Sequence, residues 1–456
     1  ACRLVELILR SHVNREYRYS IEKHRALGRK LASESAVLLK NENSILPGSQ
    51  TARTAVVGAF AKFPRYQGTG SSKITPIMLS NPFDELRSRG LEFTYADGYR
   101  MDSDLIDEDL IKEACEVVQG RDIVYIFSGL PDAYEAESFD RESMKMPDNH
   151  VRLIEEVSKV NKHVGVILLG GAPMDLSWSS RVQGILLMYL GGEATAEACI
   201  DLLLGVKNPC GKLAETWPLV DADVPSFANF PGNPLTVEYR EGIFVGYRYY
   251  DTARKTVRYP FGFGLSYTSY LYSDMQVSKV KIGENEQLSI SCKVKNIGNR
   301  EGKEIVQLYI SRQSKKIPRP EQELKGFEKI HLMPGETKEC CFQVSYADLA
   351  YYNAEKSAWM VEKGEYEIRI STSSRDIRLK ETLQVEAPGV VETLEMHNML
   401  PGYFDLSEDI QISDGEFSRL LGRPLPPRER EKGSRHTVNS TLADIHDRWL
   451  GRLLLK

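Results

Sequence analysis

The sequence predicts an α/β unit with an open, mostly parallel sheet and helices on both faces, followed by an antiparallel β-sandwich and a C-terminal helical extension. Three observations predict this order. Between residues 54 and 192, continuous apolar runs alternate with segments of helical periodicity. Beyond Leu265 the apolar residues recur at every second position. From Val390 onward the pattern returns to short helical segments.

The first domain is predicted to cover residues 25–218. A helical pattern begins at Ile21 and leads directly into a short strand and turn, VLLKNENSILP. Five further apolar runs are predicted strands: 54–60, 91–99, 122–129, 163–171 and 182–192. The predicted helices between them include 104–119, 149–162 and 194–205. Continuous apolar strands that alternate with amphipathic helices are typical of a parallel sheet with both faces covered.

The rest of the chain is predicted to form three parts. Residues 219–264 are rich in Gly, Pro and aromatic side chains, and we interpret them as a connecting loop on the surface. In residues 265–388, turn residues recur about every 8 to 12 positions, which is typical of a sandwich resembling an immunoglobulin or fibronectin type III module. Within it, Cys340 and Cys341 should point to opposite faces of one strand. Residues 389–456 form the extension, which needs a neighbouring domain, another chain or this chain's own sandwich to pack on.

Composition excludes several classes of function. At roughly 150 residues per domain, 456 residues suggest about three domains, and a hydrophobic content of 41% supplies a core for each. Because 59 basic residues face 64 acidic ones, the chain lacks the positive field that nucleic-acid binding requires. The longest apolar stretch, 164–174, contains glycines and is shorter than the ~20 residues that cross a bilayer. We therefore expect a soluble protein without nucleic-acid or membrane partners.

Cysteine and histidine usage predicts no metal site. The seven cysteines are scattered without C-x-x-C spacing, and the eight histidines have no ligand spacing. We expect reduced thiols in a cytoplasmic protein. The N-terminal segment is typical of an amphipathic helix and not of a secretory signal, although a signal already removed would leave no trace.

An acidic segment, PDAYEAESFDRESM (131–144), directly follows the predicted strand 122–129. Loops beyond the carboxyl ends of parallel strands are where ligands bind in open sheets. Two carboxylates two residues apart repel each other, which raises the pKa of the more buried one and supplies a proton donor near neutral pH. The alternative is a solvated acidic loop closed by an ion pair to Arg141. The charged candidates are Asp132, Glu135, Glu137, Asp140, Arg141 and Glu142.

A second candidate loop is QGTGSSKITP (67–76), rich in Gly and Ser. Backbone N–H groups in such a loop can hold a phosphate. Its spacing fits neither of the glycine-rich nucleotide motifs, which favours a loop that allows close approach of a ligand or a second domain. We expect no cofactor.

Five segments in order then resemble the C-terminal half of a β-glucosidase of glycoside hydrolase family three. They cover residues 26–47, 65–76, 130–157, 170–218 and 239–268. The segments KNIGNREGKEIVQLYI and ELKGFEKIHLMPGE are similar to the fibronectin type III-like domain that follows in many members. The tail segments FSRLLGRPLPP and HTVNSTLADI resemble an extension found in a subgroup of bacterial members.

The resemblance implies a retaining mechanism with two carboxylates about 5 to 5.5 Å apart. The family's acid/base glutamate lies in Glu-Gly-x-Asp-Arg, which matches residues 137–141 and gives that role to Glu137. Ser138 departs from the family's glycine, and Glu135 remains a rival acid/base. The resemblance further implies that Asp140 and Arg141 form an ion pair that fixes the loop. It also implies that the second loop borders the sugar-binding cleft, through Gly68, Gly70, Ser71 and Ser72.

The family's TIM barrel, which carries the nucleophilic aspartate, requires about 250 residues. Only residues 1–24 precede the predicted α/β domain, and they resemble the last barrel helix and the linker. The nucleophile and the residues that grip the sugar are therefore not in this sequence. A truncated or cleaved product, one subunit of a split enzyme, or a non-catalytic relative would each explain this.

Two functions are compatible with this reasoning. In the first, the chain contributes Glu137 to a β-glycosidase that a barrel-containing chain or domain completes, acting on a β-linked glucoside or oligosaccharide. The isolated chain is then inactive, because no glycosyl-enzyme intermediate forms without the nucleophile. In the second, the chain is a non-catalytic carbohydrate-binding or assembly platform derived from such an enzyme. The surface that meets the barrel in the family should be apolar and aromatic, and unpaired patches of that kind are uncommon on monomers, which favours a missing partner. A barrel-containing chain or an oligomer would each supply one.

Overall fold

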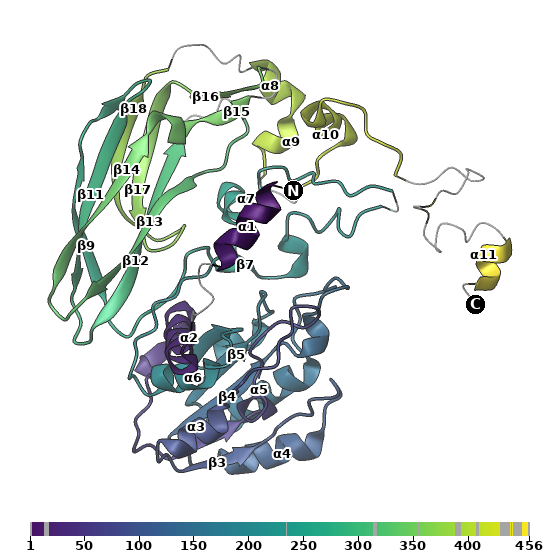
Figure 1. Cartoon of the computed structure of the whole chain (residues 1–456), viewed down its shortest axis with the longest axis vertical. Helices are drawn as coiled ribbons and strands as arrows, with labels where there is room; N and C mark the ends of the chain where they lie inside the picture. The colour runs from purple at the N-terminus through teal and green to yellow at the C-terminus, as the bar shows by residue number, and fades with distance from the viewer. Residues whose placement is uncertain are drawn as a thin grey trace.

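The computed structural model of the chain describes residues 2–12, 18–233, 235–312, 317–353, 356–387, 394–406, 410–428, 438, 440 and 449–454. Figure 1 shows an α/β unit and a β-sandwich linked by a connecting segment. The two parts also contact each other directly, since Lys303 and Lys329 of the sandwich form ion pairs with Glu34 of the α/β unit. None of the helices in these ranges is both long enough and apolar enough to cross a membrane.

The α/β unit contains a six-stranded sheet in the order β1-β6-β5-β4-β2-β3. All neighbouring strands are parallel except β1, which runs antiparallel to β6 at one edge. The predicted open, mostly parallel sheet is confirmed. The strands are β1 (Val37–Asn41), β2 (Thr54–Val57), β3 (Phe93–Ala96), β4 (Ile123–Gly129), β5 (Val164–Leu169) and β6 (Gly184–Tyr189).

Two groups of helices cover the sheet (Figure 1). In one group α6 packs against both α2 and α3, and in the other α4 packs against α5. Every residue of β4 and β5 is buried, which explains why these strands are continuous apolar runs without alternation. The helices are α2 (Ile21–Ser35), α3 (Pro82–Ser88), α4 (Glu108–Val117), α5 (Asp148–Val160) and α6 (Thr195–Leu203). The N-terminal helix α1 (Cys2–His12) precedes this unit and is exposed.

The β-sandwich consists of a five-stranded sheet, β10-β18-β17-β12-β13, and a three-stranded sheet, β14-β11-β9. The predicted antiparallel sandwich is confirmed, apart from the two-residue strand β10, which pairs with β18 in parallel. The predicted opposite faces of Cys340 and Cys341 are confirmed as well, since Cys340 is buried whereas Cys341 is exposed. A hairpin of β15 (Tyr351–Asn353) and β16 (Ala358–Met360) completes it. The strands of the two sheets are β9 (Tyr270–Val277), β10 (Lys281–Ile282), β11 (Gln287–Asn296), β12 (Gly302–Arg312), β13 (Glu323–Leu332), β14 (Thr337–Ser345), β17 (Gly364–Ser371) and β18 (Ile377–Val385).

The connecting segment is more than the surface loop that we expected from its turn residues. It contains α7 (Tyr247–Thr252) and β8 (Val257–Tyr259), which pairs with β7 (Trp217–Pro218). Its aromatic side chains form a third hydrophobic cluster with the C-terminal extension, whose helices are α8 (Leu394–Met399), α9 (Pro401–Phe404) and α10 (Asp414–Leu421). The buried members are Phe244, Tyr249, Tyr250, Ala253, Leu400, Tyr403, Leu406, Ile412 and Phe417.

Ion pairs also fasten the extension to the connecting segment. Arg240 contacts Asp414, and Arg428 donates to Glu238 at 2.8 Å. We expected the tail to pack on a neighbouring domain, another chain or this chain's own sandwich. The described part of the tail packs on the connecting segment of this same chain. The short helix α11 (Trp449–Leu454) is exposed at Trp449. The basic segment between α10 and α11 lies mostly outside the described residues.

Candidate active site

The two candidate loops meet at the carboxyl edge of the sheet. The loop 67–76 follows β2, and the acidic loop 130–147 follows β4, which pairs directly with β2. Thr69 and Ala136 form a parallel bridge between the loops, and the Glu137 N–H donates to the Thr69 carbonyl at 3.1 Å. Two segments more than sixty residues apart in sequence therefore form one surface.

Glu137 is exposed, and the second loop holds its carboxylate. Both the backbone N–H of Ser71, at 2.7 Å, and its hydroxyl donate to Oε2 of Glu137. These two hydrogen bonds lower the pKa of Glu137, and the bond from the Ser71 hydroxyl has the larger effect. The structure thus brings together two residues that we predicted separately, Ser71 and Glu137.

Gly70 allows this close approach. It has φ +116°, and a Cβ at this position would lie 2.4 Å from Cβ of Glu137. Gly68, by contrast, would place a Cβ 4.0 Å from its nearest neighbour, the Ser72 hydroxyl. Ser72 itself is exposed. Among the predicted loop residues, Gly70 and Ser71 contact Glu137, whereas Gly68 lines a neighbouring cavity.

Arg65 connects the two loops, and sequence reasoning missed it. The side chain is 6% exposed and donates to the carbonyls of Leu130, at 2.8 Å, and Gln67, at 3.0 Å. It also contacts the carboxylates of Asp132 and Glu135. The signal that could have found it is a lone arginine immediately before the glycine-rich loop, at the edge where ligands bind.

Glu135 points into the protein and is anchored there. Its Oε1 accepts a hydrogen bond from the Gly171 N–H at 2.8 Å, and its Oε2 lies 3.4 Å from Arg65. Gly171 follows β5, so Glu135 fastens the acidic loop to the next loop along the sheet edge. The two rival glutamates therefore differ in geometry, since Glu135 is bonded inward and Glu137 is exposed.

The expected ion pair between Asp140 and Arg141 is wrong. Arg141 donates instead to the carbonyls of Pro173, at 2.7 Å, and Lys145, at 3.2 Å. Asp140 is exposed, and the ion pairs found among the described residues do not include one between it and Arg141. The end of the loop is held by Asp221, which accepts from the Ser143 hydroxyl and from the Met144 N–H, both at 2.7 Å. The loop is thus fixed by backbone contacts and by a residue of the connecting segment.

The backbone at Ser138 is strained. Its φ of +84° lies in the region that favours glycine, which is the residue that the family's pattern has at this position. Ser138 adopts this conformation directly after Glu137, whose N–H is bonded to the Thr69 carbonyl of the other loop. Such strain costs on the order of 1–2 kcal/mol for a non-glycine residue.

Carboxyls with a raised pKa lie outside the acidic loop where we expected one, and burial raises the pKa of Asp251 in the connecting segment. Burial, together with the nearby charge of Glu135, raises the pKa of Glu215 to about 7. Glu215 lies between α6 and β7, in the segment KLAETWP. The signal that could have found it is a single acidic residue between the apolar residues Leu213 and Trp217.

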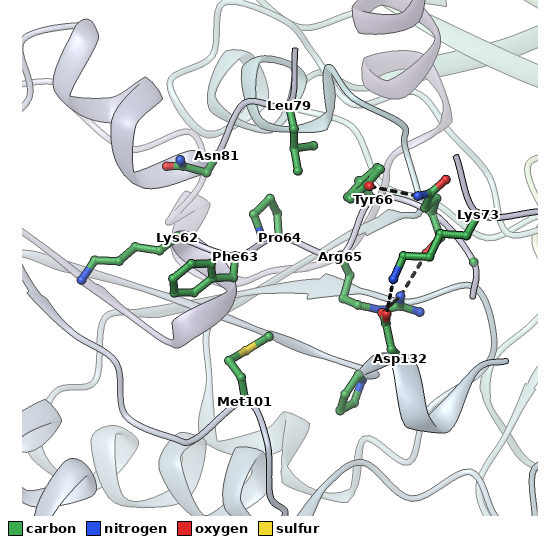
Figure 2. A pocket seen from close by; sticks show the side chains of 13 residues that line it. Lys62, Phe63, Pro64, Arg65, Tyr66, Lys73, Leu79, Asn81, Met101 and Asp132 are labelled. Atoms are coloured by element: carbon green, nitrogen blue, oxygen red, sulfur yellow. Dashed lines mark hydrogen bonds and ion pairs between the residues drawn. The ribbon is translucent and has the colours of Figure 1, made fainter. Parts of the chain in front are cut away.

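A cavity of about 440 Å³ lies beside the loop that holds Glu137. Figure 2 shows Lys73 and Arg65 converging on Asp132 at one end, with Phe63, Pro64, Leu79 and Met101 around the rest. No group of three or more His, Cys, Asp and Glu side chains suited to a metal ion occurs within the described part of the chain.

Comparison with known proteins identifies the family. Residues 36–267 match the glycosyl hydrolase family 3 C-terminal domain, and residues 304–374 match a fibronectin type III-like domain. The chain belongs to glycosyl hydrolase family 3. The first match includes β1–β6 and both candidate loops.

Relatives in the family include glycosidases of more than one specificity. The chain is 48% identical over 372 residues to thermostable beta-glucosidase B of Acetivibrio thermocellus, covering 81% of this chain and 49% of that protein. It is 38% identical over 388 residues to an exo-alpha-(1->6)-L-arabinopyranosidase of Bifidobacterium breve, covering 83% and 51%. The chain thus spans about half the length of these curated relatives.

Solved family 3 structures have the same architecture over the shared region. A GH3 beta-glucosidase of Bifidobacterium adolescentis superposes with a TM-score of 0.81 at 35% identity, covering 99% of this chain and 61% of that one. Beta-glucosidase 3B of Thermotoga neapolitana, in complex with alpha-D-glucose, gives a TM-score of 0.71 at 34% identity, covering 81% and 55%.

Proposed function

We propose that this family 3 chain supplies the general acid/base of a retaining β-glycosidase, and that Glu137 is that residue. The observation that carries the proposal is the exposed carboxylate of Glu137, held by Ser71 at the sheet edge where two loops join. Glu137 also occupies the glutamate position of the family's motif. Supporting relatives include beta-glucosidases, and the substrate that we propose is a β-linked glucoside or oligosaccharide.

Glu137 acts in both steps of a double displacement. In the first step the protonated Glu137 gives its proton to the glycosidic oxygen as that C–O bond breaks, while a carboxylate bonds to the anomeric carbon. In the second step the ionised Glu137 accepts a proton from the water that attacks the same carbon. The nucleophilic carboxylate belongs to a barrel-containing domain or chain outside this sequence.

In the chain without a barrel, the environment of Glu137 suits the second step. Because the Ser71 hydrogen bonds lower the pKa of Glu137, the uncovered side chain is ionised at neutral pH. The first step requires the protonated form. A barrel that covers the loop excludes water and brings a second carboxylate close, and both effects raise the pKa of Glu137.

Glu135 has a positioning role in this proposal, because both of its oxygens already contact protein groups. A non-catalytic platform has no chemical need for an exposed carboxylate with two donors aimed at one of its oxygens. The same geometry therefore favours the catalytic proposal over the platform.

The experiment joins the chain to the N-terminal half of the Acetivibrio thermocellus relative and measures kcat/KM with phenyl and dinitrophenyl β-glucosides. The chain alone should give no turnover, and the joined enzyme should be active. Glu137→Ala should lower kcat/KM for the phenyl glucoside about a hundredfold or more, because phenolate is a poor leaving group without a proton. The dinitrophenyl glucoside, whose leaving group needs no proton, should lose far less.

Glu142→Ala is the matched control, since Glu142 is an exposed glutamate of the same loop. It should leave both substrates unaffected. If Glu135→Ala, and not Glu137→Ala, lowers kcat/KM far more for the phenyl glucoside than for the dinitrophenyl glucoside, Glu135 is the acid/base. If neither does, the proposed role of the loop is wrong.

A further inference from the structure

Two of the seven cysteines lie opposite each other inside the β-sandwich. Cys292 on β11 and Cys340 on β14 are direct partners in the antiparallel register of these neighbouring strands. Both side chains are fully buried in the core of the sandwich, and both thiols are reduced in the structure. Because both residues point inward from adjacent strands, their thiols lie side by side on one face of the sheet.

The hydrogen bonds between the two strands fix the spacing of this pair. Asn296, four positions after Cys292, donates its N–H at 3.0 Å to the carbonyl of Glu336. Glu336 lies four positions before Cys340, so it stands directly opposite Asn296. Along an antiparallel ladder, opposite residues alternate between hydrogen-bonded and non-hydrogen-bonded pairs. Cys292 and Cys340 therefore form a hydrogen-bonded pair, whose Cα atoms are about 5.5 Å apart.

This spacing suits a disulfide at the backbone and strains it at the side chains. Bonded cysteines usually have Cα atoms roughly 4.4–6.8 Å apart, a range that includes this pair. Their Cβ atoms must approach to about 3.5–4.5 Å, whereas opposite residues of a ladder hold them about 4.5–5.5 Å apart. A disulfide at this position therefore carries strain, and strain makes a disulfide easier to reduce.

The two thiols also act on each other chemically. A hydrogen bond between the two side chains lowers the pKa of Cys292 and raises the pKa of Cys340. The thiolate is the nucleophile of thiol–disulfide exchange, so the sulfur of Cys292 is the one that attacks first. Cys340 is then the resolving thiol, because it stands directly opposite.

Cys340 lies on an edge strand, which gives the pair a route to solvent. In the sheet order β14-β11-β9, β14 is the outermost strand. The residue after Cys340, Cys341, is already exposed. Edge segments open locally at a lower free energy than the whole domain unfolds, so a small oxidant can reach the two thiols without global unfolding.

We propose that Cys292 and Cys340 form a reversible disulfide, which oxidised glutathione or a similar small disulfide makes and reduced glutathione breaks. Cys292 attacks one sulfur of the oxidant and releases the first glutathione thiol. Cys340 then attacks the sulfur of Cys292 and releases the second. The protein thus gives up two protons and two electrons, one S–S bond forms, and the S–S bond of the oxidant breaks into two thiols.

The test equilibrates the Cys341→Ser chain with mixtures of oxidised and reduced glutathione, alkylates the free thiols and identifies linked tryptic peptides by mass spectrometry. Cys341→Ser removes the thiol that shares a tryptic peptide with Cys340. Each mixture is also reached by refolding from urea, so that burial does not limit the reaction. Peptides 282–293 and 339–356 should be linked in oxidised glutathione, with two fewer alkylated thiols per chain, and should separate in excess reduced glutathione.

Cys199 is the matched control, because it is also buried, at 1% exposure, and lies on α6 in the α/β unit. It should be alkylated in every mixture, and Cys340→Ala should abolish the linked peptides. The proposal is overturned if the two peptides stay separate in oxidised glutathione alone, even after refolding. A link that excess reduced glutathione leaves intact would also overturn it, because the bond would then be a permanent structural disulfide. Equal oxidation of Cys199 would show that the register of the two strands does not select the pair.

Discussion

Ser71 gives two hydrogen bonds, one from its backbone and one from its hydroxyl, to a single oxygen of Glu137. The two residues are 66 positions apart in the sequence. Both bonds stabilise the ionised carboxylate, and their effect is a lowered pKa of Glu137.

Ser71→Ala should therefore raise the pKa of Glu137 toward its ordinary value. The shift should be partial, because the backbone N–H still donates. Carboxyl ¹³C NMR titration of the glutamate-labelled chain, with the resonance assigned from Glu137→Gln, measures it. Ser72→Ala is the control, since Ser72 is exposed next to Ser71 and should leave the pKa of Glu137 unchanged. An identical titration in Ser71→Ala and the unaltered chain would contradict the hydrogen-bond explanation.

Gly70→Ala should separate the two loops. The new Cβ has a neighbour at 2.4 Å and a φ of +116°, so we expect the free energy of unfolding to fall by about 1–3 kcal/mol. Gly68→Ala, with its nearest neighbour at 4.0 Å, should stay within about 0.5 kcal/mol. Urea unfolding followed by circular dichroism compares the pair. Equal stability of the two variants would mean that the loops are not in contact as described.

Ser138→Gly should stabilise the chain by up to about 1 kcal/mol. The relief of strain at φ +84°, on the order of 1–2 kcal/mol, exceeds the entropy cost of a glycine, about 0.5–1 kcal/mol. Ser138→Ala keeps the strain and should be close to neutral. Thermal unfolding of both variants tests this, and a destabilised Ser138→Gly would show that the backbone is relaxed.

His150 should make the chain less stable in acid. Complete burial lowers the pKa of His150 to about 3, against about 6.5 in the unfolded chain. The stabilisation is fully present above pH 6.5 and is lost as the pH falls toward 3, by about 1.4 kcal/mol per pH unit, since only the unfolded state binds the proton.

Urea unfolding between pH 6 and pH 4 measures this slope. His150→Gln should flatten it by about that amount relative to the unaltered chain. His163→Gln, at an exposed histidine, should not. Parallel slopes for all three proteins would show that His150 takes up a proton while folded.

The arrangement of strands and helices was predictable because it depends on local periodicity. The runs 122–129 and 163–171 became β4 and β5 with boundaries shifted by at most two residues. The connecting segment was not predictable in the same way. Its Phe244 stacks on the distant Tyr403, with ring centroids 6.5 Å apart, in the same buried cluster as Tyr249 and Tyr250. Aromatic residues among glycines and prolines carry no regular period that would predict such a cluster.

The candidate site was predictable in its location and its residue types, but not in its partners. The sequence placed Glu137 on a loop at the carboxyl edge of the sheet, and the family resemblance placed Ser71 on a second loop that borders the sugar-binding cleft. It paired Arg141 with its neighbour Asp140, whereas the structure gives Arg141 the carbonyl of Pro173, 32 residues away. Arg65 and Glu215 were missed for the same reason, since burial and long-range contacts decide their roles.

The cluster that joins the connecting segment to the tail sets a practical limit on truncation. Tyr403 donates to the Arg240 carbonyl at 2.7 Å, and Arg428 reaches Glu238 beyond it. An expression fragment that stops after the last sandwich strand would leave Phe244 and its neighbours bare, and such fragments tend to self-associate. A minimal crystallisable module should therefore retain the chain through Arg428.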